Sequence, residues 1–294
     1  MGGRDKPDHD TAFLGAINLW PTAQIHGNLH PMTHAAQPAI VRIAMWSGPR
    51  NISTAMMRAF ENRPDCVVWD EPFYAAELAA TGRDHPMRDD VIAAGPTDPE
   101  AVIARLTGPL PNTTKPSARV FYQKHMTHHM IPAFPRDWID HPEIVNAFLI
   151  REPERVLASY TQKWADVTLD DIGVPQQAEL FDRVAQRLGH APPVVDTADI
   201  LAGPQGTLSA LCAALGIPFS AAMLSWPAGR RASDGVWAPA WYNAVEASTG
   251  FGPPDPRPLP KLDGELARIA DRARPVYARL AQHRRKGARM SEVQ

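Results

Sequence analysis

Short apolar runs alternate along the chain with segments whose apolar residues recur at helical spacing. The runs cover residues 41–46, 66–69, 118–123, 143–150 and 194–196, and turn residues follow them. Continuous apolar runs are typical of buried strands in a parallel sheet, and alternating strands and helices predict a sheet covered on both faces. We therefore predict an α/β protein with a mainly parallel central sheet and helices on both faces.

The first run leads into the stretch Trp46-Ser-Gly-Pro-Arg-Asn-Ile-Ser-Thr54, after which the helical pattern begins. A helix N-terminus carries unpaired backbone N–H groups and a partial positive charge, so a loop that enters one can bind an anion. Arg50 adds a full charge, and Ser53 and Thr54 can either donate hydroxyl groups to the anion or cap the helix.

Two further runs end in ionisable residues. Asp70-Glu71-Pro72 follows the second run, and Lys124 and His125 follow the third. Ligands of open parallel sheets bind at the carboxyl ends of strands, so these side chains are expected near the Arg50 loop. One carboxylate could instead cap the helix that begins near Phe73.

The histidines His125, His128 and His129 have a spacing that metal ligands use on one helical face. No Asp, Glu or Cys lies among them, and a metal site needs further ligands and supporting contacts. We therefore predict no metal here and treat the histidines as candidates for the cleft.

Arg151 ends the fourth run, and Ser159 lies two helical turns beyond it. Both side chains can converge on one anion; alternatively, Arg151 pairs with Glu152 or Glu154. A later Gly-flanked loop carries Arg230 and Arg231, which suit a phosphate or form a solvated basic turn.

Composition restricts the location and the partners of the protein. The 294 residues are 44% hydrophobic, with 30 basic and 32 acidic residues, so the chain can bury a large core and has no overall charge that favours nucleic acid or an anionic membrane. No run approaches the roughly 18 apolar residues of a membrane span. Two cysteines in apolar surroundings indicate buried free thiols in a cytoplasmic protein.

We expect three parts along the chain. Residues 1–39 show no sustained period and are predicted to be a disordered extension, residues 40–250 form the α/β domain, and residues 251–294 form a proline-rich linker and a C-terminal helix.

These patterns, taken together and in order, resemble the sulfotransferases that use 3'-phosphoadenosine 5'-phosphosulfate (PAPS). That family's first loop reads approximately Lys or Arg, Ser, Gly and two hydroxyl residues, and Arg50-Asn-Ile-Ser-Thr54 takes its place. The family also has a strand ending in arginine with a serine eight positions later, matched by Arg151 and Ser159, and a basic loop ending in glycine, approximated by Arg230 to Gly235. The resemblance covers about residues 40–240 and implies a three-layer P-loop-like fold.

This chain departs from the family pattern in two places. Asn51-Ile52 replaces Ser-Gly in the first loop, so we expect less room for a phosphate. In the cytosolic branch a catalytic histidine lies two residues beyond a strand-end lysine, whereas His125 follows Lys124 directly. Other branches use a Glu-Pro pair after the second strand, which Glu71-Pro72 matches.

The resemblance implies sulfuryl transfer from PAPS to a hydroxyl or amine of a small-molecule acceptor, with 3'-phosphoadenosine 5'-phosphate (PAP) as product. Glu71 would be the general base and Arg50 would stabilise the leaving phosphate, with Lys124, His125 and His128 in reserve as catalytic residues. The donor would be held by Arg50, Asn51, Ser53, Thr54, Arg151, Ser159, Arg230, Arg231 and Gly235. The resemblance requires no metal.

Two other functions stay open. A P-loop kinase or NTPase would share the strand, loop and helix, although the loop lacks the Gly-Lys-Ser/Thr ending. A non-catalytic nucleotide-binding or interaction protein would account for Asn51-Ile52. The sequence leaves the acceptor and the oligomeric state undetermined.

Overall fold

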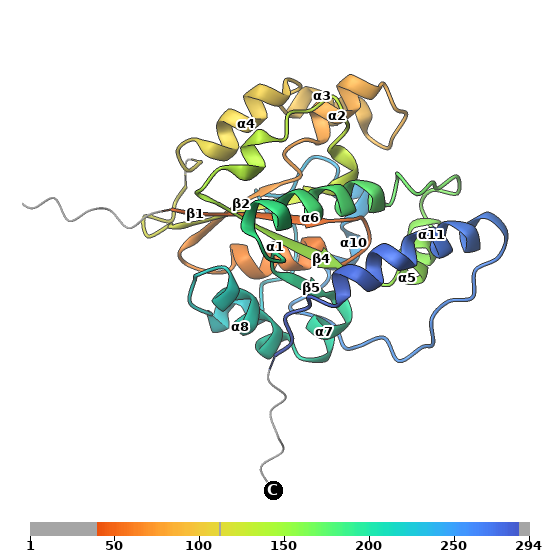
Figure 1. Ribbon diagram of the computed structural model, residues 1–294. Helices are drawn as coiled ribbons and strands as arrows, with labels where there is room; N and C mark the ends of the chain where they lie inside the picture. The colour runs from red at the N-terminus through yellow and green to blue at the C-terminus, as the bar shows by residue number, and fades with distance from the viewer. Residues whose placement is uncertain (1–39, 112, 288–294) are drawn as a thin grey trace, which may run out of the picture. The chain divides into compact units, whose positions relative to one another are not determined.

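The five apolar runs form one sheet in which all neighbouring strands are parallel. In the computed structural model, which describes residues 40–111 and 113–287, the strand order is β2-β3-β1-β4-β5 (Figure 1). The strands are β1 (Val41–Ser47), β2 (Cys66–Asp70), β3 (Val120–Met126), β4 (Ile144–Ile150) and β5 (Val194–Asp196). The predicted extension, residues 1–39, lies outside the described residues.

Helices connect the strands. The α-helices are α1 (Ser53–Glu61), α2 (Tyr74–Thr81), α3 (Arg88–Ala94), α4 (Pro99–Thr107), α5 (Pro153–Tyr160), α6 (Val174–Leu188), α7 (Thr197–Ala202), α8 (Pro204–Ala214), α9 (Ala238–Trp241), α10 (Asn243–Glu246) and α11 (Gly264–Ala281). The 3₁₀ helices are η1 (Thr127–His129), η2 (Asp137–Asp140) and η3 (Ala221–Leu224). Several helices start with the expected signals: Pro99 opens α4, and Asp98 accepts a hydrogen bond from the backbone N–H of Glu100 at 3.0 Å.

Helices cover both faces of the sheet, which confirms the predicted three-layer arrangement. On one face, Ile43 and Met45 of β1 pack in a buried cluster with Phe60 of α1 and with residues of α7 and α8. On the other face, Ala44 and Trp46 pack with residues of α4, α6 and α11. The alternation of β1 side chains between two apolar layers explains why the whole strand is apolar.

The same alternation separates the residues of β3. Tyr122 stacks on Phe60 of α1 at 4.3 Å between ring centroids, and Lys124, two residues later, points to the same face. His125 points to the opposite face and stacks on Trp46 at 4.4 Å. Lys124 can therefore reach a site on the α1 face, and His125 cannot.

The C-terminal helix α11 is part of the packed domain and not a separate solvated element. Its residues Ile269, Ala270 and Ala273 pack with Leu157 of α5, and Leu280 joins the core beside α6. In the described part of the chain, residues on both sides of position 250 therefore share one packed core.

Candidate functional site

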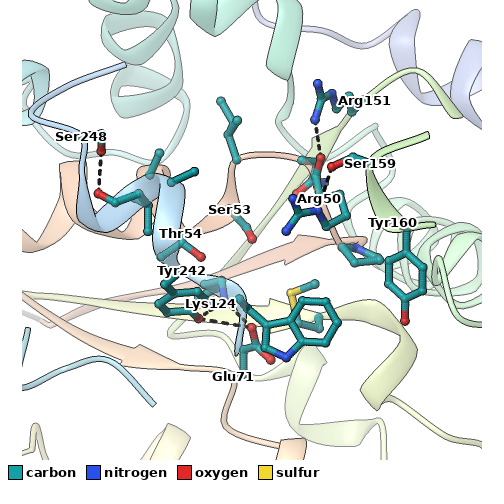
Figure 2. A pocket seen from close by; sticks show the side chains of 18 of the residues that line it. Arg50, Ser53, Thr54, Glu71, Lys124, Arg151, Ser159, Tyr160, Tyr242 and Ser248 are labelled. Atoms are coloured by element: carbon teal, nitrogen blue, oxygen red, sulfur yellow. Dashed lines mark hydrogen bonds and ion pairs between the residues drawn. The ribbon is translucent and has the colours of Figure 1, made fainter. Parts of the chain in front are cut away.

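A cavity of about 450 Å³ opens at the carboxyl edge of the sheet. It is lined by the loop after β1, Glu71 after β2, the end of β3, residues of α5 and the segment from Trp241 to Pro253. Its size is typical of a small-molecule site, and its position is where open parallel sheets bind ligands. Figure 2 shows Arg50, Ser159 and Arg151 gathered in one part, with Glu71, Lys124 and Tyr242 in another.

The loop after β1 has an unusual backbone. Arg50 and Ile52 have φ angles of 61° and 60°, in the left-handed region that costs a residue other than glycine about 1–2 kcal/mol. Asn51 between them anchors the loop, because its side-chain amide donates to the Leu149 carbonyl at 3.0 Å and its own carbonyl accepts from Thr197 Oγ1 at 3.0 Å. Ile52 thus adopts a glycine-like conformation where the family pattern has glycine.

The first turn of α1 faces the cavity without a side-chain cap. The N-cap residue is Ile52, whose side chain makes no capping hydrogen bond, and Ser53 and Thr54 line the cavity. The two hydroxyl residues therefore do not cap the helix. Backbone N–H groups, hydroxyls and the helix dipole together form an arrangement that attracts an anion.

Two arginines add full positive charge beside this helix end. Arg50 Nε donates to Ser159 Oγ at 2.9 Å, and Arg151 donates to the Arg50 carbonyl at 2.5 Å, so the three residues are joined (Figure 2). Burial lowers the pKa of both guanidinium groups, but arginine stays charged in proteins. Arg151 Nε is buried and, among the described residues, has no hydrogen-bond partner.

The acids beside Arg151 are paired elsewhere. Glu152 lies 3.9 Å from Arg155, and Glu154 lies 2.5 Å from Arg274. The alternative pairing of Arg151 with one of these acids is therefore not found, and its charge is available to the cavity.

Lys124 is the centre of a buried polar network. Its ammonium donates to Asp70 Oδ1 at 2.8 Å, Glu71 Oε1 at 2.5 Å and Tyr242 Oη at 2.9 Å, which uses all three of its protons. Tyr242 in turn donates to Asp70 Oδ2 at 2.6 Å and accepts from Trp237 Nε1 at 3.0 Å. Asp70 is fully engaged in this network, whereas Glu71 lines the cavity.

Within this network, the pKa values of Glu71 and Lys124 are shifted by different causes. Burial raises the pKa of Glu71, and the ammonium of Lys124 offsets this only in part. Burial alone would lower the pKa of Lys124, but the facing carboxylates of Asp70 and Glu71 raise it well above its usual value. Glu71 therefore binds a proton more readily than an ordinary glutamate does, whereas Lys124 stays protonated. Glu71 also has a φ of 43°, a strained conformation of the kind found at functional sites.

The histidines divide between the two faces of the sheet. His128 and His129 line the cavity, and His129 Nε2 lies 3.9 Å from Glu71 Oε2. His125 does not reach the cavity: it is buried between aromatic rings, which lowers its pKa to about 3. The catalytic role that the sequence suggested for His125 therefore does not fit the structure, because strand alternation turns the side chain away. The described residues contain no group of three or more His, Cys, Asp or Glu side chains placed to hold a metal ion.

Comparison with known proteins identifies the family. The profile of the family described as "Sulfotransferase domain" matches residues 41–283, which is most of the chain. The chain belongs to the sulfotransferase family. Residues 41–283 include α11, in agreement with its packing in the core.

Two curated relatives come from Arabidopsis thaliana. "Branched-chain-amino-acid aminotransferase-like protein 1" is 34% identical over 250 residues, which is 84% of this chain and 42% of the relative. "Branched-chain-amino-acid aminotransferase-like protein 2" is 32% identical over 244 residues, 82% of this chain and 41% of the relative. The chain thus spans about two fifths of the relatives it matches.

Solved sulfotransferase structures are similar at low sequence identity. The "Sulfotransferase Domain from the Curacin Biosynthetic Pathway" is 16% identical with a TM-score of 0.45, covering 79% of this chain and 97% of that one. A sulfotransferase from Alicyclobacillus acidocaldarius is 12% identical with a TM-score of 0.46, covering 83% and 96%.

The late basic loop of this sulfotransferase domain does not reach the cavity. Arg230 is 56% exposed and lies 3.7 Å from Glu246, and Arg231 donates to the Pro227 carbonyl at 3.0 Å. The backbone N–H of Gly235 donates to Asp70 at 3.2 Å. The phosphate contacts predicted for Arg230, Arg231 and Gly235 are therefore not supported, and the loop instead holds the buried network in place.

Several cavity residues were not singled out from the sequence. Tyr74, His85 and Tyr160 contribute rings, and Ser248 and Phe251 line the part next to α10. Tyr160 follows Ser159 directly and Tyr74 lies three residues after Glu71, so proximity to known candidates could have indicated both. Phe251 was assigned to the linker because of its proline-rich surroundings.

No helix in the described part of the sulfotransferase domain is long and apolar enough to cross a membrane.

Proposed function

We propose that this protein transfers a sulfuryl group from PAPS to a hydroxyl or amine of a small-molecule acceptor. The observation that carries the proposal is that one cavity joins a two-arginine anion site at a helix N-terminus to a partly buried carboxylate whose pKa is raised. A sulfuryl transferase needs both parts: cations for a phosphosulfate and a base for the acceptor. Membership of the sulfotransferase family agrees with this assignment.

The residues around the first loop suit an anionic donor. Arg50, the uncapped N–H groups of α1 and the hydroxyls of Ser53 and Thr54 would bind the 5'-phosphosulfate, while Asn51 holds the loop backbone. Arg151, with its unpartnered Nε, and Ser159 would bind the 3'-phosphate. The donor supplies an activated sulfuryl group, so the protein needs to position it and to stabilise charge.

Glu71 is the proposed general base. It would accept the proton of the acceptor as the acceptor's oxygen or nitrogen forms its bond to sulfur and the bond from sulfur to the phosphate oxygen breaks. Arg50 would offset the negative charge that develops on the leaving PAP phosphate, a contribution that is largest in a preorganised site shielded from water.

The reserve candidates differ in their ability to act as a base. Lys124 is protonated and donates all three of its protons, so it would orient Glu71 without accepting a proton. Burial lowers the pKa of His128 well below its usual value, so its neutral ring is the second candidate. The buried free thiols Cys66 and Cys212 fit the reducing cytoplasm that we propose as the location.

Replacing Glu71 with glutamine tests the proposal. Transfer from PAPS should fall by about 10²- to 10⁴-fold, the usual contribution of a general base, while PAP still binds. Glu77→Gln is the matched control, because Glu77 is also buried and its pKa is also raised by burial, but it pairs with Arg83 away from the cavity lining. Transfer that survives in Glu71→Gln would exclude Glu71 as the base and direct attention to His128.

A further inference from the structure

We propose that the acceptor is a neutral aromatic alcohol of the phenol class, bound between aromatic and imidazole rings beside Glu71. This inference rests on the proposed function, because it names the acceptor of that reaction. Neither the family assignment nor the relatives specify an acceptor for this chain.

Flat rings from separate segments of the chain line this part of the cavity. The rings of Tyr74 and His129 stack with centroids 4.5 Å apart and planes 10° apart. The rings of His85 and Trp241 stack at 5.4 Å and 16°, and Tyr160 lies 6.4 Å from Trp241 at 24°. All five residues line the cavity. Surfaces of this kind bind planar rings better than saturated ones, because stacking adds to the apolar area that is buried.

The ring surface lies next to the proposed base. His129 Nε2 is 3.9 Å from Glu71 Oε2, and Tyr242 Oη is 3.4 Å from Glu71 Oε1. A ring held against Tyr74 and His129 would therefore present a substituent to the group that takes its proton. The cavity runs from here without a break to Arg50 and the first turn of α1.

The charges of the lining disfavour an ionic acceptor. Lys124 faces the two carboxylates Asp70 and Glu71 and donates all three of its protons, and Arg50 and Arg151 are assigned to the donor. Among the described residues that line the cavity, a carboxylate acceptor would therefore find no free cation beside the rings. Glu71 is the proposed base, and a neutral hydroxyl can supply the proton that it accepts, whereas a permanently charged group adds nothing to this step.

Two imidazoles of the lining have a ring nitrogen that a neutral polar group could partner. The Nδ1 atoms of His128 and His129 are buried and, among the described residues, have no hydrogen-bond partner. Burial lowers the pKa of both rings well below its usual value, so they are uncharged at neutral pH. A buried polar atom without a partner favours a ligand that supplies one.

Calorimetric titrations of the full chain in the presence of PAP test the inference. The probes are 2-naphthol, its saturated counterpart decahydro-2-naphthol, 2-naphthoate and 2-naphthylmethylammonium. We expect 2-naphthol to bind about five- to tenfold more tightly than the saturated alcohol, and more tightly than either ion.

Two tryptophan variants assign this preference to the cavity. Trp241→Leu should remove most of the difference between 2-naphthol and the saturated alcohol. Trp164→Leu should keep it, because the ring of Trp164 lies 5.8 Å from that of His85, tilted by 41°, but does not line the cavity.

The outcomes separate the two proposals. A separate titration with PAP alone tests the proposed function, and failure of PAP to bind in it would contradict that function. Equal binding of the saturated alcohol, stronger binding of either ion, no binding of 2-naphthol, or a preference that survives Trp241→Leu would each overturn the aromatic acceptor, whether or not PAP binds.

Discussion

Replacing Asp70 with asparagine tests whether the buried network behind the cavity holds the site together. Asp70 is 3% exposed and accepts hydrogen bonds from Lys124 at 2.8 Å, Tyr242 at 2.6 Å and the backbone of Gly235 at 3.2 Å. Asparagine keeps the shape of the side chain but removes its charge and one acceptor oxygen. The substitution therefore isolates the electrostatic contribution.

The contacts set the size of the expected effect. Removing one partner of a buried ion pair costs about 3–5 kcal/mol when the other charge is left uncompensated. Lys124 still has Glu71 at 2.5 Å, which reduces this cost, but Tyr242 loses a charged acceptor, a further cost of about 1 kcal/mol. We expect the free energy of unfolding to fall by about 3 kcal/mol. PAP binding should be kept in the folded fraction, because Asp70 does not line the cavity.

Urea unfolding followed by circular dichroism measures this change. Asp182→Asn is the matched control: Asp182 pairs with Arg279 at 2.6 Å, but the two side chains are 56% and 43% exposed, so the loss should be about 0.5 kcal/mol. If Asp70→Asn lowers the free energy of unfolding no more than Asp182→Asn does, the buried network does not stabilise the fold, and it cannot be what holds Glu71 in place.

Three further predictions concern the charged and reactive groups of the site and core. Because burial raises the pKa of Glu71, the transfer rate should rise with pH through a pKa above that of an ordinary glutamate, and a pH-rate profile with no such limb would argue against Glu71 as base. Ser159→Ala removes the group that orients Arg50, so calorimetry should show PAP binding weakened by up to about tenfold; unchanged affinity would exclude Ser159 from the donor site. Burial raises the pKa of Cys66 to about 12 and that of Cys212 to about 11, so a thiol reagent at pH 8 should modify neither until urea unfolds the chain; rapid labelling of the native protein would contradict their burial.

The strand and helix order was predictable because the chain has an almost uninterrupted alternation of patterns. Strands such as 144–150 are apolar throughout since both faces of the sheet are covered, and the turn residues after them mark the carboxyl edge. Arg50, Glu71, Lys124, Arg151 and Ser159, which line one cavity, could therefore be predicted as candidates from their places at strand ends or on the helices that follow.

Other features of the site could not be predicted, because they depend on contacts between segments that are distant in the sequence. The sequence shows two arginines in a Gly-flanked loop, but not that Asp234 of this loop forms a buried ion pair with Arg58 at 2.7 Å and holds the loop against α1. Strand alternation predicts that Lys124 and His125 point to opposite faces of β3, but which of the two faces the cavity depends on how the sheet packs. The prolines after residue 250 predicted a linker, but they do not show that Phe251 packs on Trp226 with ring centroids 5.1 Å apart.

The most direct test of the central claim is calorimetric binding of PAP, ATP and ADP to the wild-type chain, to Arg151→Ala and to Arg155→Ala. Arg155 carries the same charge four residues later, in α5, but it pairs with Asp255 at 2.8 Å and does not line the cavity. We predict micromolar binding of PAP, weaker binding of ATP and ADP, and loss of PAP binding in Arg151→Ala alone. Equal or tighter binding of ATP, no binding of any of the three, or equal loss in both variants would contradict a PAPS-dependent sulfotransferase site.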